Sequence, residues 1–81
     1  MEIRYSKKAV KYIDKQDKPT KIAIKRAIEN LPSGNVSPYK GHDIITHRLR
    51  IGNHRVLYYY ELANVIYVEK IGPRGDVYKG V

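Results

Sequence analysis

The chain has 81 residues, which is too few for two independent cores, because domains usually run about 50 to 200 residues. We therefore expect a single domain over residues 1–81. Apolar residues make up 42% of the chain and occur in short runs, which excludes a membrane-spanning helix of roughly 20 apolar residues. Cysteine is absent, which excludes disulfides and a zinc finger. The polar start has no signal-like apolar stretch, so we expect a cytoplasmic protein without a membrane partner.

The charge balance points to an anionic partner. Sixteen Lys and Arg against eight Asp and Glu give a net charge of +8, and a small protein this basic usually meets something anionic. Residues 1–40 carry +6, mostly from Lys, and residues 41–81 carry +2. Lysines on a helix are most often a solvated face. The planar guanidinium of arginine suits phosphate contacts better, and the second half holds Arg48, Arg50, Arg55 and Arg74.

The first half predicts a strand followed by two helices. Ile3 to Tyr5 are typical of a short edge strand, and Ser6 is a suitable N-cap for a helix that buries Ala9, Val10 and Ile13. Asp17 or Lys18 then caps a second helix with Pro19 in its first turn. The spacing of Ile24, Ala27, Ile28 and Leu31 indicates its buried stripe. We expect the helices to form a hairpin, and we expect irregular chain from Leu31 to Gly41, where Pro32, Gly34, Pro38 and Gly41 interrupt regular structure.

The second half predicts antiparallel strands. From Ile45 to Ile51 the apolar period becomes two, with Ile45, His47, Leu49 and Ile51 alternating with Thr46, Arg48 and Arg50. Gly52 and Asn53 predict a tight hairpin turn. The run from His54 to Leu62 is expected to be the central strand, and Val65 to Ile71 another. Gly72 and Pro73 are expected to end it, before a short strand or extended tail over residues 76–79.

These elements predict an α+β fold. The expected architecture is an N-terminal strand, a two-helix hairpin, and a three- to four-strand antiparallel sheet with the helices on one face. Pairing through the Gly52–Asn53 turn would bring Arg48 and Arg50 close to Arg55, on the sheet face away from the helices. Such a cluster is unfavourable unless an anion fills it. The alternative is that the arginines pair with Glu61, Glu69 and Asp76.

The sequence gives little basis for metal or covalent catalysis. The acidic residues are scattered and form no DxD, ExxH or HxH spacing, there is no Gly-rich phosphate loop, and no cysteine or paired carboxylates are available. We therefore expect no metal and no cofactor. Metal-free phosphoryl chemistry or plain binding remains.

RNA supplies its own nucleophile, the 2′-hydroxyl, so a protein can cleave it by orienting that group and neutralising the phosphate. Arginine neutralises charge but handles protons poorly. The candidates for proton transfer are Tyr78, His47 and His54. Tyr78 could instead stack on a base or pack against the sheet. In the run from Tyr58 to Tyr60 at least one ring must face the core, while another could be exposed for stacking.

Two segments resemble a known family. His47 to Tyr58, HRLRIGNHRVLY, and Ile71 to Tyr78, IGPRGDVY, resemble the RLRxGxxRVxY and GxRxDVY signatures of RelE-type toxins in the RelE/ParE superfamily. The order of elements and the length match over the whole chain. The resemblance implies the toxin of a type II toxin–antitoxin system. Such a toxin is an endoribonuclease (mRNA interferase) that cleaves mRNA in the ribosomal A site without a metal, inhibits translation, and is silenced by an acidic, RelB-like antitoxin.

The resemblance also implies roles for individual residues. Arg55 matches the phosphate-stabilising arginine, Arg74 the arginine near the leaving group, and Tyr78 the tyrosine that activates the 2′-hydroxyl. Arg48 matches one of two family lysines. Thr46 stands at the other, and the resemblance suggests the neighbouring His47 as a substitute for that lysine. Arg50, His47 and His54 are expected to contact RNA.

Two other functions stay open. ParE-like gyrase poisons share the fold but generally lack the catalytic set, so Arg55, Arg74 and Tyr78 favour RNA cleavage. An RNA-binding domain without catalysis needs only the charge.

Overall fold

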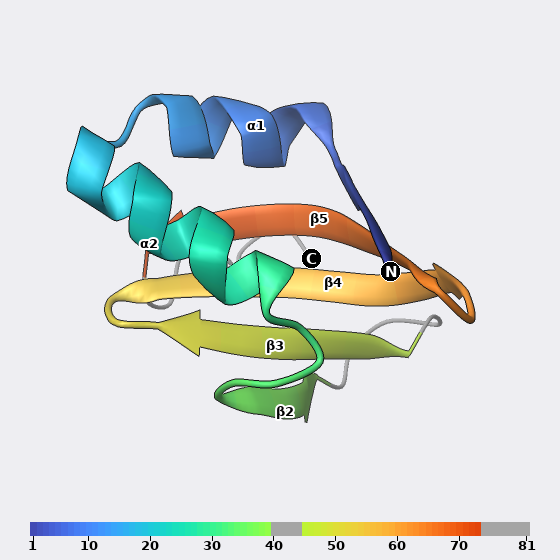
Figure 1. Ribbon diagram of the computed structural model, residues 1–81. Helices are drawn as coiled ribbons and strands as arrows, with labels where there is room; N and C mark the ends of the chain where they lie inside the picture. The colour runs from blue at the N-terminus through green and yellow to red at the C-terminus, as the bar shows by residue number, and fades with distance from the viewer. Residues whose placement is uncertain (40–44, 74–81) are drawn as a thin grey trace.

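The computed structural model describes residues 1–39 and 45–73. In chain order the elements are β1 (Glu2–Tyr5), α1 (Lys7–Asp14), α2 (Lys18–Glu29), β2 (Val36–Tyr39), β3 (Thr46–Ile51), β4 (His54–Leu62) and β5 (Val65–Pro73). The strands form one sheet in the order β1-β5-β4-β3-β2, with both helices on one face (Figure 1). The predicted α+β fold, with its central strand at 54–62, is confirmed.

β1 closes one edge of the sheet by pairing with β5 in parallel. The other three pairings are antiparallel. A parallel pair needs a long crossover connection, which here contains both helices and three strands. The first and last described strands therefore lie side by side, with α1 packed over β5 (Figure 1).

Both helices begin at the predicted caps. The Ser6 hydroxyl accepts a hydrogen bond from the amide of Ala9 at 3.0 Å, and the Asp17 carboxylate accepts one from the amide of Thr20 at 3.2 Å. These bonds satisfy amides that have no partner within the first helical turn. The Thr20 hydrogen bonds also lower the pKa of Asp17.

Ser6 also fastens α1 to an irregularity in β5. Leu57 is opposite Lys70 and Tyr58 is opposite Val68, so Glu69 is an extra residue in the β4–β5 ladder. The carbonyl of Glu69 accepts a hydrogen bond from the Ser6 hydroxyl at 2.6 Å. Without this bulge, strand alternation would turn Glu69 toward the helices; with it, Val68 faces the core.

The core lies between the helices and the sheet. Its fully buried members come from both helices and from β3, β4 and β5: Ala9, Ile13, Ile24, Ile28, Leu49, Val56, Tyr58, Ile66 and Val68. Leu31, just beyond α2, is buried as predicted, and Ala27 is half-buried. The prediction was wrong for Val10, which is 44% exposed. Tyr12 packs against the core in its place, because two turns of helix bury positions 9 and 13 directly and leave position 10 at the side.

Two strand predictions need correction. Residues 36–39 form β2 instead of irregular chain. An edge strand tolerates Pro38 because only one of its sides donates to the sheet. Gly72 and Pro73 do not end the last described strand, since β5 runs to Pro73. The strand or tail expected over residues 76–79 lies outside the described residues.

β3 also departs from simple alternation at its start. Ile45 precedes the strand and is 79% exposed, whereas Thr46 is 2% exposed. The Gly52–Asn53 turn is as predicted, although of these two residues only Gly52 has a positive φ, of 55°.

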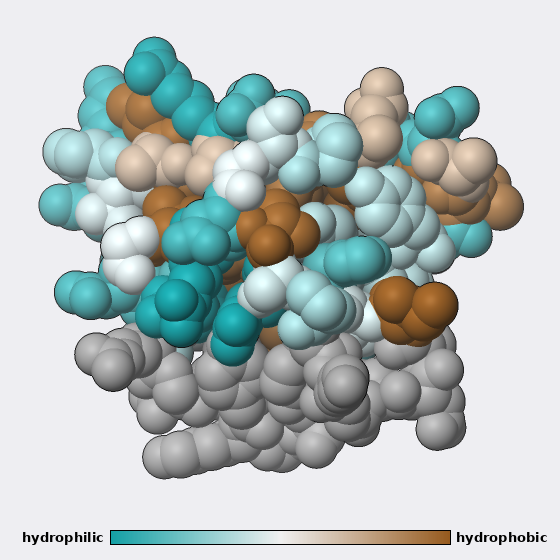
Figure 2. All heavy atoms as spheres, turned by 90° about the horizontal axis from the view of Figure 1, so that it is seen from below, coloured by the Kyte–Doolittle hydropathy of each residue, from teal (hydrophilic) through white to brown (hydrophobic). Residues whose placement is uncertain are grey.

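Seen from below, where β2 forms the edge, the coloured surface is mainly hydrophilic, with smaller apolar groups between (Figure 2). Neither described helix is long and apolar enough to cross a membrane.

Candidate nucleic-acid interface

The β3–β4 hairpin places two arginines directly opposite each other. Arg50 of β3 pairs in register with Arg55 of β4, and directly opposite residues have Cβ atoms about 5 Å apart. Their neighbours Leu49 and Val56, also opposite each other, belong to the core under the helices. Because side chains alternate along a strand, Arg50 and Arg55 lie on the face away from the helices, as predicted. We call this surface, with Arg48, the arginine face.

Arg55 is held rigidly for an arginine. It is only 8% exposed, and its Nη1 donates hydrogen bonds to the carbonyls of Gly52, at 2.9 Å, and His54, at 3.0 Å. Both carbonyls belong to the turn or its first strand residue, so the hairpin that brings Arg55 opposite Arg50 also orients its guanidinium. Two acceptors use only part of a group that carries five N–H donors.

Arg48 is positioned by the strand that the sequence did not reveal. Its Nε and Nη2 donate to the Ser37 hydroxyl at 3.1 and 2.8 Å, and Ser37 lies opposite Arg48 in the β2–β3 ladder. Ser37 is therefore a site residue that the sequence analysis missed. Pro38 beside it reads as a strand breaker, and only the alternation of Val36 with Ser37 could have suggested an edge strand.

The sequence left open that acidic residues neutralise these arginines. For Arg50 and Arg55, residues 1–39 and 45–73 give no support for such pairing. No carboxylate there lies within 4.0 Å of the guanidinium of Arg50 or Arg55. Glu61 is 3.9 Å from Arg4 instead. Asp76, the third acidic residue considered, lies outside this part of the chain. Among the residues that the structure describes, Arg50 and Arg55 are thus two adjacent positive groups without a counter-ion.

The two histidines lie on the opposite face of the hairpin. His47 is opposite buried Tyr58, and their rings are stacked with centroids 5.3 Å apart. The Nδ1 atom of His54 is 2.6 Å from the hydroxyl oxygen of Tyr12 on α1. The structure therefore does not bring either ring onto the arginine face. Strand alternation explains why, since residues 47 and 54 share the parity of Leu49 and Val56.

Thr46 shares the arginine side of β3 with Arg48 and Arg50, and it is almost completely buried. His47 is the next residue along the strand, so its side chain lies on the opposite face and cannot take the place of the Thr46 side chain.

The tyrosine run divides as expected: Tyr58 is in the core, where burial and then Tyr60 raise its pKa to about 12, while Tyr60 is 37% exposed. Tyr60 lies edge-on to the His47 ring, with centroids 5.7 Å apart.

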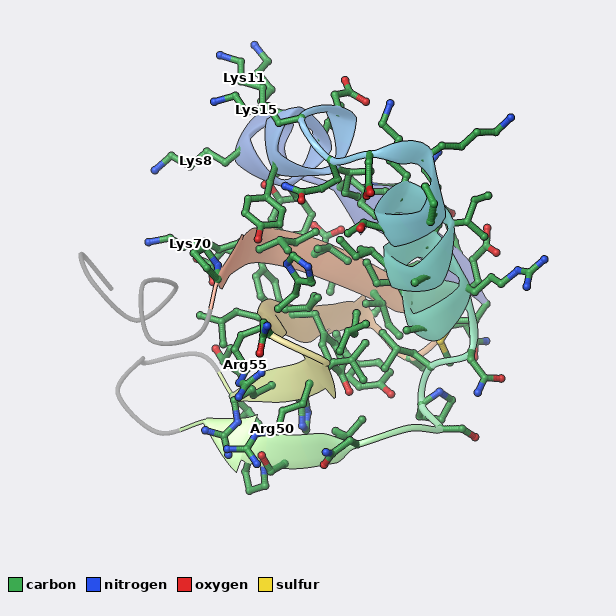
Figure 3. The ribbon with its side chains drawn as sticks, turned by 90° about the vertical axis from the view of Figure 1, so that its left-hand side faces the viewer. Lys8, Lys11, Lys15, Arg50, Arg55 and Lys70 are labelled. Atoms are coloured by element: carbon green, nitrogen blue, oxygen red, sulfur yellow. The ribbon has the colours of Figure 1, made fainter. Side chains whose placement is uncertain are left out.

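Arg74 and Tyr78 lie outside the described residues, so their positions relative to Arg55 stay predictions. Lys70, which the sequence analysis did not select, lies opposite Leu57 on the β5 side of the arginine face. In Figure 3, Lys70, Arg55 and Arg50 lie on the same side of the molecule. Within the described ranges no group of three or more His, Cys, Asp or Glu could hold a metal ion.

The comparisons with known proteins bear on the fold. No family model and no curated protein matches the chain. Among solved structures, it is similar to a chain of the crystal structure of an archaeal RelE–RelB complex from Pyrococcus horikoshii OT3. The TM-score is 0.70 at 24% sequence identity, over 93% of this chain and 96% of that chain. The α+β architecture described above is therefore the fold of a RelE-type toxin.

Proposed function

We propose that this protein is the toxin of a type II toxin–antitoxin system and that it cleaves mRNA in the ribosomal A site, in the cytoplasm, without a catalytic metal. The similarity to a chain of a RelE–RelB complex supports the toxin fold, and the sequence signatures of RelE-type toxins support the activity. The observation that carries most weight is the state of Arg55: buried, oriented by two carbonyls, opposite a second arginine and without a described counter-ion.

A phosphodiester is the ligand that this arrangement fits. A buried charge without a partner is costly, and a phosphate would supply both the negative charge and acceptors for the remaining N–H donors of Arg55. Donors that are already oriented toward a developing negative charge stabilise a transition state without having to reorganise. Arg50 would add to the same field, and Ser37 would keep Arg48 beside it.

In the proposed reaction the 2′-oxygen of the RNA attacks the adjacent phosphorus and the bond from phosphorus to the 5′-oxygen breaks. One proton leaves the 2′-hydroxyl and one is delivered to the departing 5′-oxygen. The products are a 2′,3′-cyclic phosphate and a 5′-hydroxyl end. Arg55 would stabilise the charge on the non-bridging oxygens. By resemblance, Arg74 would act near the leaving oxygen and Tyr78 on the 2′-hydroxyl.

The proposed partner is an acidic, RelB-like antitoxin. The similar structure is that of a RelE–RelB complex, and a chain with a net charge of +8 associates faster with an oppositely charged segment. An antitoxin segment that folds on contact and covers the arginine face would silence the enzyme by excluding RNA.

The experiment is to add the purified protein to a cell-free translation reaction and to map new RNA 5′ ends, with a gyrase supercoiling assay run in parallel. New ends at codons in the A site, with supercoiling unaffected, are expected. Inhibition of supercoiling without new RNA ends would point to a gyrase poison. Retention of RNA on the protein without new ends would point to a binding domain. Either result would overturn the proposal.

A further inference from the structure

A second set of positive side chains lies on α1 and at Lys15, the residue that caps its C-terminus. Lys8, Lys11 and Lys15 are exposed and recur at the spacing i, i+3 and i+7, so they share one face of the helix. At a rise of 1.5 Å per residue the row is about 10 Å long. No carboxylate in residues 1–39 and 45–73 forms an ion pair with these three ammonium groups. We call them the lysine row.

The lysine row continues the charge of the arginine face onto the helical layer. Figure 3 shows Lys8, Lys11 and Lys15 extending to the same side of the molecule as Lys70, Arg55 and Arg50. The elements that carry these residues are neighbours in the fold. α1 packs on β5, β5 pairs with β4, and β4 pairs with β3. The positive surface is therefore wider than the hairpin alone.

The chemistry of the two parts differs. The lysine ammonium groups are flexible point charges, whereas Arg55 and Arg48 are oriented by hydrogen bonds. The aromatic residue of α1, Tyr12, is half-buried and its hydroxyl is engaged by His54, so the row itself offers no ring for base stacking. Proteins that bind single strands usually combine charge with stacking rings. Charge without rings suits contacts to a phosphate backbone, as in double-stranded RNA.

We propose that the lysine row binds the phosphate backbone of double-stranded RNA, while the single strand to be cut occupies the arginine face. The second half of this statement rests on the proposed function; the first does not. An RNA duplex fits better than an acidic protein segment because its phosphates continue along a rigid backbone that can follow a positive surface from one layer of the domain to the other.

The test compares two triple variants of the full chain. The first is Lys8→Gln, Lys11→Gln, Lys15→Gln. The matched control is Lys18→Gln, Lys21→Gln, Lys25→Gln on α2, which removes the same charge at the same spacing. The probe is an RNA duplex of about 16 base pairs, the length that a double-stranded-RNA domain spans, and its affinity is measured at several salt concentrations. Circular dichroism checks that both variants are folded.

We expect the lysine-row variant to bind the duplex at least about tenfold more weakly at 0.1 M salt, with a salt slope of log K smaller by about 3, one for each lost phosphate contact. The control should keep most of the parent's affinity and slope. Equal losses in both variants would reduce the effect to net charge and overturn the inference. The inference would also be overturned if the lysine-row variant kept its affinity for the duplex but lost affinity for a polyglutamate peptide, because the row would then bind an acidic protein segment.

The outcome is separable from that of the proposed function. Duplex affinity is measured without any cleavage step, so the lysine row can be confirmed in a protein that cuts no RNA. Conversely, cleavage of mRNA together with an unchanged duplex affinity in the lysine-row variant would leave the proposed function standing and remove only this inference.

Discussion

The two faces of the β3–β4 hairpin differ although their residues alternate along the same strands. On the helix side, Leu49 and Val56 are almost completely buried in an apolar core. On the other side, Arg50 and Arg55 lie opposite each other without a described counter-ion. The first face stabilises the fold, and the second places like charges where they repel. This difference is typical of a sheet that binds a ligand on one face, because functional sites often retain arrangements that lower the stability of the fold.

The largest expected effect on folding comes from the core side. Leu49→Ala should lower the free energy of unfolding by about 2 to 5 kcal/mol, because it removes a buried side chain and leaves a cavity. The adjacent Arg50→Gln, on the other face, is the matched control and should change stability by less than about 1 kcal/mol. Urea unfolding of both variants makes the comparison, and similar losses would contradict the division between the faces.

The next effect concerns the junction between α1 and the core side of β5. Ser6→Ala should cost about 1 to 3 kcal/mol, because it removes the cap of the Ala9 amide and the hydrogen bond to the Glu69 carbonyl at the bulge. Ser33, an exposed serine outside any helix, provides the control variant Ser33→Ala. If both variants unfold at the same urea concentration, Ser6 does not fasten the two elements.

Alkaline pH should weaken the core side through Tyr58. Its folded-state pKa of about 12 lies above the value of about 10 for an unfolded tyrosine. The neutral phenol therefore contributes stability that is fully present below pH 10 and is lost as the pH rises from 10 toward 12. Tyr58→Phe should show a smaller fall in melting temperature over this range than the parent. Parallel curves for the two proteins would show that Tyr58 does not titrate in the core.

The smallest effect sharpens the arginine side. Like charges directly opposite each other on a sheet are destabilising, so Arg50→Gln should raise the free energy of unfolding by about 0.2 to 1 kcal/mol at low salt. This gain should shrink in 0.5 M salt, where the charges are screened. The variant should at the same time bind RNA more weakly. A stability change that is independent of salt would mean that the two guanidinium groups do not repel each other measurably.

Much of this arrangement follows from the sequence, and the exceptions have physical reasons. Alternation along β3 and β4 and the Gly52–Asn53 turn were enough to predict that Arg50 and Arg55 meet. The α1 cap followed from Ser6, and the α2 cap, Asp17, was one of two candidates with Lys18. Ser37 could not be predicted because its role depends on the register of an edge strand that contains a proline.

The histidines show a second limit of sequence reasoning. Residue type makes His47 and His54 candidates for proton transfer, but the parity of a strand position decides which face a side chain occupies. That parity turns His47 toward Tyr58 and His54 toward Tyr12. Arg55 shows a third limit, since its burial and its two carbonyl contacts depend on the folded turn. Truncating Arg55 to alanine should therefore lower the stability of the fold, because the carbonyls of Gly52 and His54 lose their donor.

The most direct test of the proposed function is therefore made on Arg55 with a variant that keeps most of the side-chain volume. Arg55→Gln and the control Arg26→Gln, an exposed arginine of α2, are compared with the parent in single-turnover cleavage of ribosome-bound mRNA, with unfolding measured in parallel. If Arg55 stabilises the phosphate charge, its variant should cleave about 10² to 10³ times more slowly, while the Arg26 variant stays close to the parent. Cleavage by a folded Arg55→Gln variant at the parent's rate would contradict the proposed role of the arginine face.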